Sequence, residues 1–244
     1  MSLLKNPFKA VVIGATGGIG REVVRQLAAN NNAEKVYAVS RSGKDFDKDN
    51  ITSLTGDVTD EQSLKKAAAQ IKEDGKVQLV FVATGILHGE NLQPEKALKD
   101  LEMAQMDQVF KVNTFGPALV AKHFTPLLDG DNQSVFAAIS ARVGSISDNC
   151  LGGWYAYRAS KSALNMLLKG MSIELARTNK KAVVLGLHPG TVDTDLSEPF
   201  QKNVPEGKLF TPEYSAGKLL EVINKADKDS SGKVFDYAGE EVKP

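Results

Sequence analysis

Residues 9–20 read Lys9-Ala-Val-Val-Ile13-Gly14-Ala-Thr16-Gly-Gly18-Ile19-Gly20. The first half of this stretch is an apolar run rich in β-branched residues, which predicts a short buried strand. Gly14 ends the run, and Val23, Val24 and Leu27 then fall on one face of a helix. We therefore expect a strand, a tight turn rich in glycine and a helix at the start of the chain.

The alternation of strand and helix continues along the whole chain. Predicted strands cover residues 9–13, 35–39, 51–54, 77–82, 134–139, 182–187 and 233–237, and predicted helices cover 20–29, 61–72, 101–128, 154–177 and 211–224, with a kink expected at Gly116 and Pro117. Continuous apolar strands are buried on both faces, and the connections between them are long enough to hold helices. The pattern predicts a Rossmann-type α/β fold, a doubly wound parallel sheet with helices on both faces.

Length and composition narrow the classes of function. A chain of 244 residues with 42% hydrophobic content suits a single domain covering residues 1–244. Thirty basic residues balance thirty acidic ones, so no net charge draws the protein to nucleic acid or to an anionic membrane. No apolar stretch approaches the length of a bilayer span, which predicts a soluble protein. A small-molecule ligand is the expected partner.

The cysteine and histidine content predicts a cytoplasmic protein without a bound metal ion. Cys150 is the only cysteine, so an internal disulfide and a cysteine zinc site are excluded, and a reducing compartment is expected. His88, His123 and His188 lack metal-ligand spacing and are interpreted as structural or surface residues. Residues 191–210 lack clear periodicity, and a loop of this length suggests a substrate lid.

The glycine turn has the position of a dinucleotide phosphate site. Gly14, Gly18 and Gly20 lie between the first strand and the first helix, where backbone amides can face a pyrophosphate. The second strand ends near Arg41 with no carboxylate to bind a ribose 2′-hydroxyl, which favours NADP(H) over NAD(H). The alternative is that Arg41 is a solvated surface residue. Asp57 either contacts adenine or caps a helix.

Tyr157 and Lys161 are four residues apart near the start of the predicted helix 154–177, which places them on one helix face. A phenol has an ordinary pKa near about 10 and is a poor acid or base at neutral pH. An ammonium group close to the phenol stabilises the phenolate and brings its pKa toward the range that acid–base catalysis needs. The pair therefore predicts a proton-transfer site.

Taken together, Gly14-x-x-x-Gly18-x-Gly20, Gly56-Asp57-Val58, Asn113, Tyr157-Arg-Ala-Ser-Lys161 and Pro189-Gly190-Thr-Val192-Asp-Thr194 resemble the short-chain dehydrogenase/reductase family. The stretch from Gly144-Ser-Ile to Gly152-Gly-Trp-Tyr-Ala-Tyr-Arg looks like the branch of C-factor proteins and Sniffer-type carbonyl reductases. The resemblance implies a homodimer or homotetramer built through the helices that contain Asn113 and Tyr157.

The same resemblance assigns roles to individual residues. It implies that Tyr157 is the catalytic acid or base, that Lys161 lowers the Tyr157 pKa and holds the nicotinamide ribose, and that Asn113 positions a water for proton relay. Val192 and Thr194 would contact the nicotinamide carboxamide. The full set expected at the cofactor is Gly14, Thr16, Gly18, Ile19, Gly20, Arg41, Asp57, Val58, Gly85, Asn113, Tyr157, Lys161, Pro189, Gly190, Val192 and Thr194.

The sequence departs from the family pattern at two places. Val82-Ala83-Thr84-Gly85 stands where the family has Asn-Asn-Ala-Gly, so hydrogen bonds made by those asparagines are replaced or absent. Ala141 occupies the slot of the serine that polarises the substrate carbonyl, a contribution often worth a few kcal/mol. Ser145 is the first candidate to supply the missing hydroxyl and Ser140 the second.

Two functions follow. The first is an NADP(H)-dependent oxidoreductase that moves a hydride between nicotinamide and a carbonyl or alcohol carbon, as a carbonyl reductase does. The second is a cofactor-binding signalling or regulatory protein of the C-factor type with little turnover, which Ala141 permits.

Overall fold

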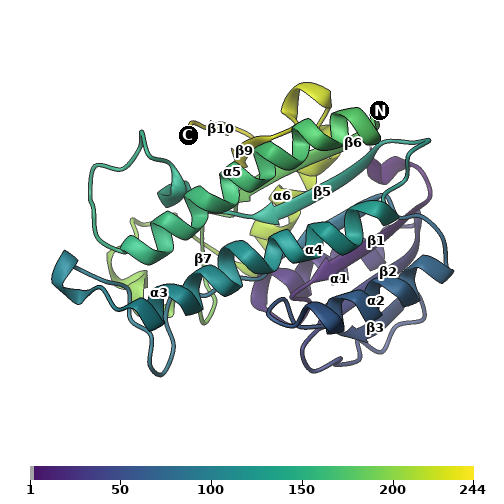
Figure 1. Ribbon diagram of the computed structural model, residues 1–244. Coiled ribbons are helices and arrows are strands. Elements are labelled where there is room, and N and C mark those ends of the chain that lie inside the picture. The colour runs from purple at the N-terminus through teal and green to yellow at the C-terminus, as the bar shows by residue number, and fades with distance from the viewer. Residues whose placement is uncertain (1–2) are drawn as a thin grey trace.

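The computed structural model describes residues 3–244, and its centre is a sheet of eight strands in the order β10-β9-β6-β5-β4-β1-β2-β3 (Figure 1). Within those residues, the last strand alone runs antiparallel to its neighbour. The strands are β1 (Phe8–Ile13), β2 (Ala33–Ser40), β3 (Ile51–Thr55), β4 (Leu79–Val82), β5 (Ser134–Ile139), β6 (Ala182–His188), β9 (Lys233–Asp236) and β10 (Glu241–Val242). The predicted Rossmann-type fold is confirmed.

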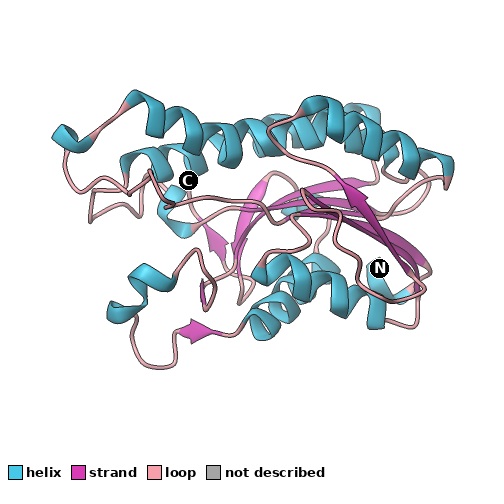
Figure 2. Cartoon of the chain, turned by 90° about the horizontal axis from the view of Figure 1, so that it is seen from below, coloured by secondary structure: helices cyan, strands magenta, loops and turns pink. Residues whose placement is uncertain are grey.

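Helices cover both faces of the sheet, as Figure 2 shows in cross-section. On one face lie α1 (Gly18–Ala29) and α6 (Pro212–Lys225), and on the other lie α2 (Glu61–Glu73), α4 (Gly116–Phe124) and α5 (Tyr155–Thr178). Side chains of β1 alternate between the two cores: Val11 and Ile13 pack under α2, α4 and α5, whereas Ala10 and Val12 pack under α1 and α6. A strand buried on both faces needs the continuous apolar run seen in the sequence.

The strand order reverses at β1, which lies between β2 and β4. Connections on the two sides of such a point leave in opposite directions, so a crevice opens beyond the carboxyl ends of the strands. The glycine turn follows β1, residues 83–85 follow β4, and Pro189 follows β6. The fold thus brings the predicted cofactor residues to one edge of the sheet.

The helix predicted over residues 101–128 changes its winding in the middle. It consists of α3 (Met103–Phe110), a π-helical turn at Lys111–Phe115, α4 and a short 3-10 turn at Thr125–Leu127. Gly116 and Pro117 lie at the start of α4, directly after the π-helical turn. A Cβ atom on Gly116 would stand 2.8 Å from the Cβ of Val58, so the glycine permits this segment to approach the loop after β3.

Residues 191–210, predicted to be a lid without regular structure, contain short elements of their own. Strands β7 (Thr191–Val192) and β8 (Leu209–Phe210) pair at the base of the segment, and a 3-10 helix spans Glu198–Asn203 between them. Across residues 3–244, no helix is both long enough and apolar enough to cross a membrane.

Candidate active site

The turn after β1 leaves the amino end of α1 open to a ligand. Gly14 has a φ of 83°, and a Cβ on Gly20 would stand 2.2 Å from the Gly14 carbonyl oxygen, so neither position accepts a larger residue without movement. Gly17 and Gly18 are exposed, and the helix has no side-chain cap and no acidic residue in its first turn. Its first N–H groups are therefore free to bind an anion. Thr16 and Ile19 are half-buried beside them.

The lid segment begins against this turn. A Cβ on Gly18 would stand 2.5 Å from the Thr194 methyl carbon, so the two residues are in close contact. Val192 is buried, and its carbonyl oxygen accepts hydrogen bonds from Thr194 Oγ1 (3.3 Å) and Ser197 Oγ (2.5 Å). The structure thus joins the turn and the residues expected at the nicotinamide.

Pro189 and Gly190 connect β6 to the lid. The Ser215 hydroxyl of α6 donates to the Pro189 carbonyl at 2.9 Å. Gly190 has a φ of 78°, and a Cβ there would stand 2.6 Å from the Phe210 ring. This turn must therefore contain glycine, and it directs the chain from the sheet edge toward the crevice.

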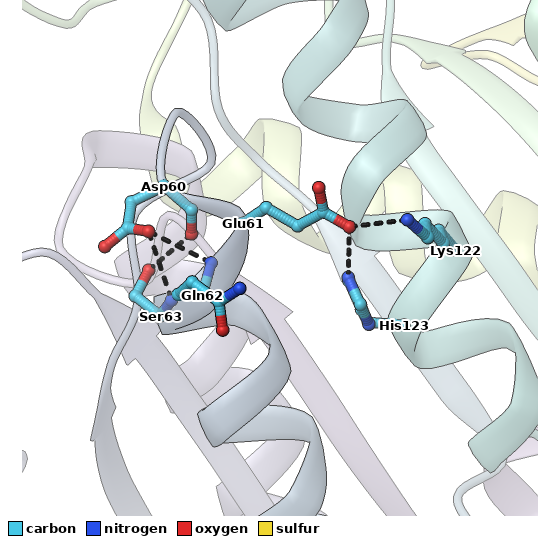
Figure 3. Close-up of polar contacts among 6 residues, drawn as sticks. All are labelled: Asp60, Glu61, Gln62, Ser63, Lys122 and His123. Carbon is cyan, nitrogen blue, oxygen red and sulfur yellow. Dashed lines mark hydrogen bonds and ion pairs between the residues drawn. The ribbon is translucent and has the colours of Figure 1, made fainter.

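The expected adenosine end lies beyond β2 and β3. Arg41 follows the last residue of β2 and is exposed, and Val58 is buried. Asp57 Oδ1 accepts hydrogen bonds from the backbone N–H and the hydroxyl of Thr59, both at 2.8 Å. The N-cap of α2 is Asp60, which accepts from the N–H groups of Gln62 and Ser63 (Figure 3). The cap role considered for Asp57 thus belongs to Asp60.

Tyr157, Lys161 and Asn113 come together from two helical segments. Tyr157 and Lys161 are buried one turn apart on α5, with Lys161 Nζ 5.8 Å from the Tyr157 ring centroid and donating to the Ile139 carbonyl at 2.9 Å. A Cβ on the exposed Gly85 would stand 3.6 Å from Lys161 Nζ and 3.7 Å from Asn113 Oδ1. Lys161 and Asn113 therefore lie beside the chain where it leaves β4, and Tyr157 lies next to Lys161.

Asn113 lies in the π-helical turn and holds the backbone after β4. Its Oδ1 accepts from Ile86 N–H at 2.8 Å, while its Nδ2 donates to the Ile86 carbonyl at 2.9 Å and to Ser160 Oγ at 3.2 Å. Beside it, the Thr114 hydroxyl donates to the Ser160 carbonyl at 2.8 Å. Two side chains of the π-helical turn thus fix α5 next to the loop that carries Gly85.

Burial acts on the ionisable pair in opposite directions. Desolvation raises the pKa of Tyr157 to about 12 and lowers the pKa of Lys161 to about 8, because burial disfavours each charged form. The phenol is therefore protonated throughout the neutral range in the ligand-free protein. The Lys161 ammonium group loses its proton at a lower pH than an exposed lysine does, because its pKa is about 8 instead of 10.5.

Both candidate serines are engaged with protein partners. Ser140 Oγ donates to Asn165 Oδ1 at 2.6 Å. Ser145 Oγ accepts from Asp148 N–H at 3.1 Å and lies 3.3 Å from Ser147 Oγ, whose own proton goes to the Pro244 carbonyl. Ser145 is therefore the donor in the serine pair. A substrate carbonyl would have to displace a protein acceptor to bond with either hydroxyl.

The surroundings of Tyr157 are apolar. Leu87 and Ala141 are buried with it, and Val143, Trp154, Leu196 and Phe200 pack against them. The Trp154 ring lies 4.9 Å from the Phe200 ring and 6.3 Å from the Tyr157 ring, measured between centroids. His88 Nε2 hydrogen-bonds the Asp195 carbonyl oxygen at 2.9 Å, and its ring contacts Phe200. The lid is thus held over Tyr157 by apolar and aromatic contacts.

Sequence reasoning missed Trp154, Phe200 and His88 as members of the site. Trp154 follows Gly152 and Gly153, and this glycine pair before a bulky residue was the one available signal.

The structure also shows the outcome of the departure from the family pattern at Val82-Ala83-Thr84-Gly85. Ala83 N–H donates to the Ile13 carbonyl at 2.8 Å, and Thr84 Oγ1 is buried without a hydrogen-bond partner. Within the described chain, no group of three or more His, Cys, Asp or Glu side chains could hold a metal ion.

Comparison with known proteins agrees with this arrangement. A dehydrogenase of Rhodococcus sp. that acts on 1-hydroxy-2-glutathionyl-2-methyl-3-butene is 32% identical over 91% of this chain and 93% of its own length. C-signal of Myxococcus xanthus is 38% identical over 60% of this chain and 82% of its own length.

Solved structures share the fold. An NADPH-bound carbonyl reductase from chicken fatty liver has a TM-score of 0.85 at 26% identity, covering 98% of this chain and 100% of that one. Carbonyl reductase Sniffer of D. melanogaster has a TM-score of 0.84 at 23% identity with the same coverage. Because residues 9–205 also match the family described as short chain dehydrogenase, this chain belongs to that family of oxidoreductases.

Proposed function

We propose that the protein is an NADP(H)-dependent reductase of small apolar carbonyl compounds. The observation that carries the proposal is the buried pair of Lys161 and Asn113 beside the exposed Gly85, with Tyr157 next to Lys161, at the same sheet edge as an uncapped glycine turn. Exposed glycines at the turn leave room for a dinucleotide, and the free N–H groups of α1 suit its phosphates. Bound there, nicotinamide would supply or accept the hydride.

The protein's own groups would handle the proton and the orientation. The Tyr157 phenol, protonated at neutral pH, donates its proton to the carbonyl oxygen of the substrate as hydride reaches the carbon. Lys161 stabilises the phenolate left behind and binds the cofactor ribose. Asn113 holds the chain after β4 so that Gly85 can approach the cofactor closely. Reduction uses the protonated phenol, which is the form of Tyr157 present at neutral pH, whereas oxidation of an alcohol would need the phenolate.

The cofactor preference rests on Arg41, whose guanidinium lies exposed at the end of β2 and can bind a 2′-phosphate in bidentate fashion. We expect Arg41→Ala to raise the Kd for NADPH at least tenfold and to leave the Kd for NADH nearly unchanged. Isothermal titration with both cofactors measures the two values. Arg25→Ala, an exposed arginine paired with Glu22 on α1, is the matched control. Equal affinity of the parent protein for NADPH and NADH would contradict the preference.

The activity itself is tested by mixing the protein with NADPH and a panel of aldehydes, ketones and quinones and following absorbance at the nicotinamide band. Loss of absorbance that depends on both protein and substrate supports the reductase. Neutral apolar carbonyls should react faster than anionic ones, because Leu87, Val143, Trp154 and Phe200 surround Tyr157.

A second candidate is a signalling or regulatory protein that binds the cofactor without turnover. It is favoured by Ala141, by the occupied hydroxyl groups of Ser140 and Ser145, and by the similarity to C-signal. Tight NADPH binding together with no turnover across the panel would support it over the reductase.

We also propose a homodimer or homotetramer that forms through α4 and α5. Phe115, Met166, Leu167 and Ile173 are exposed apolar residues on α5 and on the turn before α4. Sedimentation of the parent protein as a monomer at micromolar concentration would contradict this assembly.

A further inference from the structure

Three consecutive residues with left-handed backbone precede the catalytic helix. Gly152 and Gly153 each have a φ of 65°, and Trp154 has a φ of 49°. Glycine adopts this conformation freely, but a bulky residue with a Cβ does so only at a cost and only where its surroundings hold it. Trp154 is also the N-cap of α5 and makes no capping hydrogen bond with its own side chain.

Glu95 makes the contacts that hold Trp154 in place. This residue is 4% exposed and lies on the loop after β4, far from α5 in sequence. Its carbonyl oxygen accepts from Trp154 N–H at 2.6 Å, and its carboxylate Oε2 accepts from Ala156 N–H at 3.2 Å. The first turn of α5 contains no acidic residue of its own, so Glu95 supplies both the cap and a charge that complements the helix dipole.

Trp154 in turn touches the reactive group and the lid. Its ring packs edge-on against Tyr157 at 6.3 Å and against Phe200 at 4.9 Å between centroids. A return of Trp154 to a right-handed or extended backbone would redirect the indole and open the apolar wall beside the phenol. Arg158 also holds this loop, because it donates to the carbonyl oxygens of Gly153 and Val143.

We propose that Glu95 is a positioning residue for the substrate site: its two hydrogen bonds hold Trp154 in the left-handed conformation that places the indole in contact with both Tyr157 and Phe200. Glu95 contacts neither substrate nor cofactor and acts through Trp154. The kinetic part of this proposal rests on the reductase activity proposed above, whereas the conformational part does not.

Trp154 is the only tryptophan of the chain, so intrinsic fluorescence reports its position directly. Glu95→Leu removes the carboxylate acceptor, and we expect the emission to move to longer wavelength as the indole gains contact with water. Glu95→Gln keeps an oxygen acceptor and should restore the parent emission. Glu90→Leu, an exposed glutamate on the same loop, is the control and should leave the emission unchanged. Parent-like emission from Glu95→Leu, or no rescue by Gln, would overturn the proposal even if the protein proved to have no turnover.

Kinetics then test the link between the two residues. Glu95→Leu should raise KM for apolar carbonyls about tenfold while the Kd for NADPH stays unchanged. In a Trp154→Ala background the same substitution should have little further effect on KM, because both changes act through one indole. Additive effects in the double variant would show that Glu95 does not act through Trp154. Failure of the parent protein to turn over any substrate would instead refute the reductase.

The strain itself has an independent test that does not depend on how Glu95 variants fold. Trp154→Gly should resist urea better than Trp154→Ala, the reverse of the usual order, because glycine alone adopts a φ near 50° without strain. Equal or lower resistance of Trp154→Gly would contradict the strained conformation.

Discussion

Tyr157 and Lys161 are buried one turn apart on α5, and burial raises the pKa of Tyr157 and lowers the pKa of Lys161, so that the neutral form of each is favoured. Tyr157→Phe should lower kcat by about 10²- to 10⁴-fold and leave the Kd for NADPH nearly unchanged, because the ring still fills its space and only the transferable proton is removed. Stopped-flow single turnovers separate this loss from product release. Carbonyl reduction by Tyr157→Phe at the parent rate would refute the proposed mechanism.

Lys161→Met should lose both functions that are assigned to the ammonium group. Removal of the charge should raise the pKa of Tyr157 further and would remove the proposed hydrogen-bond donor to the cofactor ribose, so we expect kcat to fall and the Kd for NADPH to rise. Lys169→Met, an exposed lysine further along α5, is the matched control. A Kd for NADPH equal to that of the parent would restrict Lys161 to acid–base chemistry.

Ala141 leaves the site without the hydroxyl that polarises a carbonyl, because Ser140 and Ser145 use their protons within the protein. Ala141→Ser should therefore raise kcat/KM about tenfold or more, a gain equivalent to part of one oxyanion donor. Ser145→Ala should have little effect on the same substrates. A large loss in Ser145→Ala with no gain in Ala141→Ser would return the role to Ser145.

The roles of some site residues can be predicted from the sequence, whereas the hydrogen bonds of others cannot. Tyr157, Lys161 and the glycines are visible because their spacing is local and their neighbours in sequence are also their neighbours in space. The engagement of the serines was not visible, because Ser140 bonds Asn165 on α5 and Ser147 bonds Pro244 in the last strand's tail. Hydrogen-bond partners that far along the chain follow from the packing alone.

At the scale of elements, the junction of β1 and α1 depends on the absence of one carbon atom. In Gly20→Ala the new Cβ would meet the backbone oxygen of Gly14, which cannot move away as a side chain can. We expect a lower urea midpoint and at least a tenfold loss of NADPH affinity, measured together. Gly170→Ala, on α5 with open space around it, should instead stabilise the protein by about 1 kcal/mol. Parent-like binding by Gly20→Ala would show that the turn tolerates displacement.

Helices α2 and α4 are joined across the surface by one carboxylate. Glu61 Oε1 accepts from Lys122 Nζ at 2.6 Å and from His123 Nε2 at 2.9 Å, and these contacts lower the pKa of the Glu61 carboxyl (Figure 3). Exposed pairs of this kind contribute little to stability. They connect α2 to α4, which continues directly from the π-helical turn that carries Asn113.

Elements with strong periodicity were predicted well, and their irregularities were not. The bounds of α2 and β5 agree with the sequence to within a residue. Strand β10 has only two residues and forms by pairing with the edge strand β9, so no local sequence pattern predicts it. The π-helical turn keeps helical composition throughout and differs only in hydrogen bonding, which periodicity does not register.

At the scale of the whole molecule, a half-buried imidazole at the end of β6 makes folding sensitive to acid. Burial, with the nearby Arg142 charge, lowers the pKa of His188 to about 4, against an opposing effect of Asp236 and Asp148. The unfolded chain binds this proton near the ordinary pKa of about 6.5, and the folded chain binds it only near pH 4. Stability should therefore fall as the pH drops from about 6.5 to 4.

His188→Asn should remove this part of the acid sensitivity. Urea midpoints of the parent and the variant, measured at pH 7.5 and at pH 5, give the difference, which should amount to at most about 2 kcal/mol. His88→Asn is the control for an imidazole outside the sheet core. The same pH dependence in the parent and in His188→Asn would exclude His188 as the cause.

The π-helical turn at Lys111–Phe115 also constrains the number of residues between α3 and α4. It holds one more residue than regular winding would, and each residue of an α-helix turns the chain by about 100°. A chain one residue shorter here would rotate α3 against α4, so that the two could no longer both face the partners they have now. Alignments of relatives should therefore show substitutions but almost no insertions or deletions between residues 103 and 124. Residues of this segment can be substituted during evolution more easily than they can be added or removed.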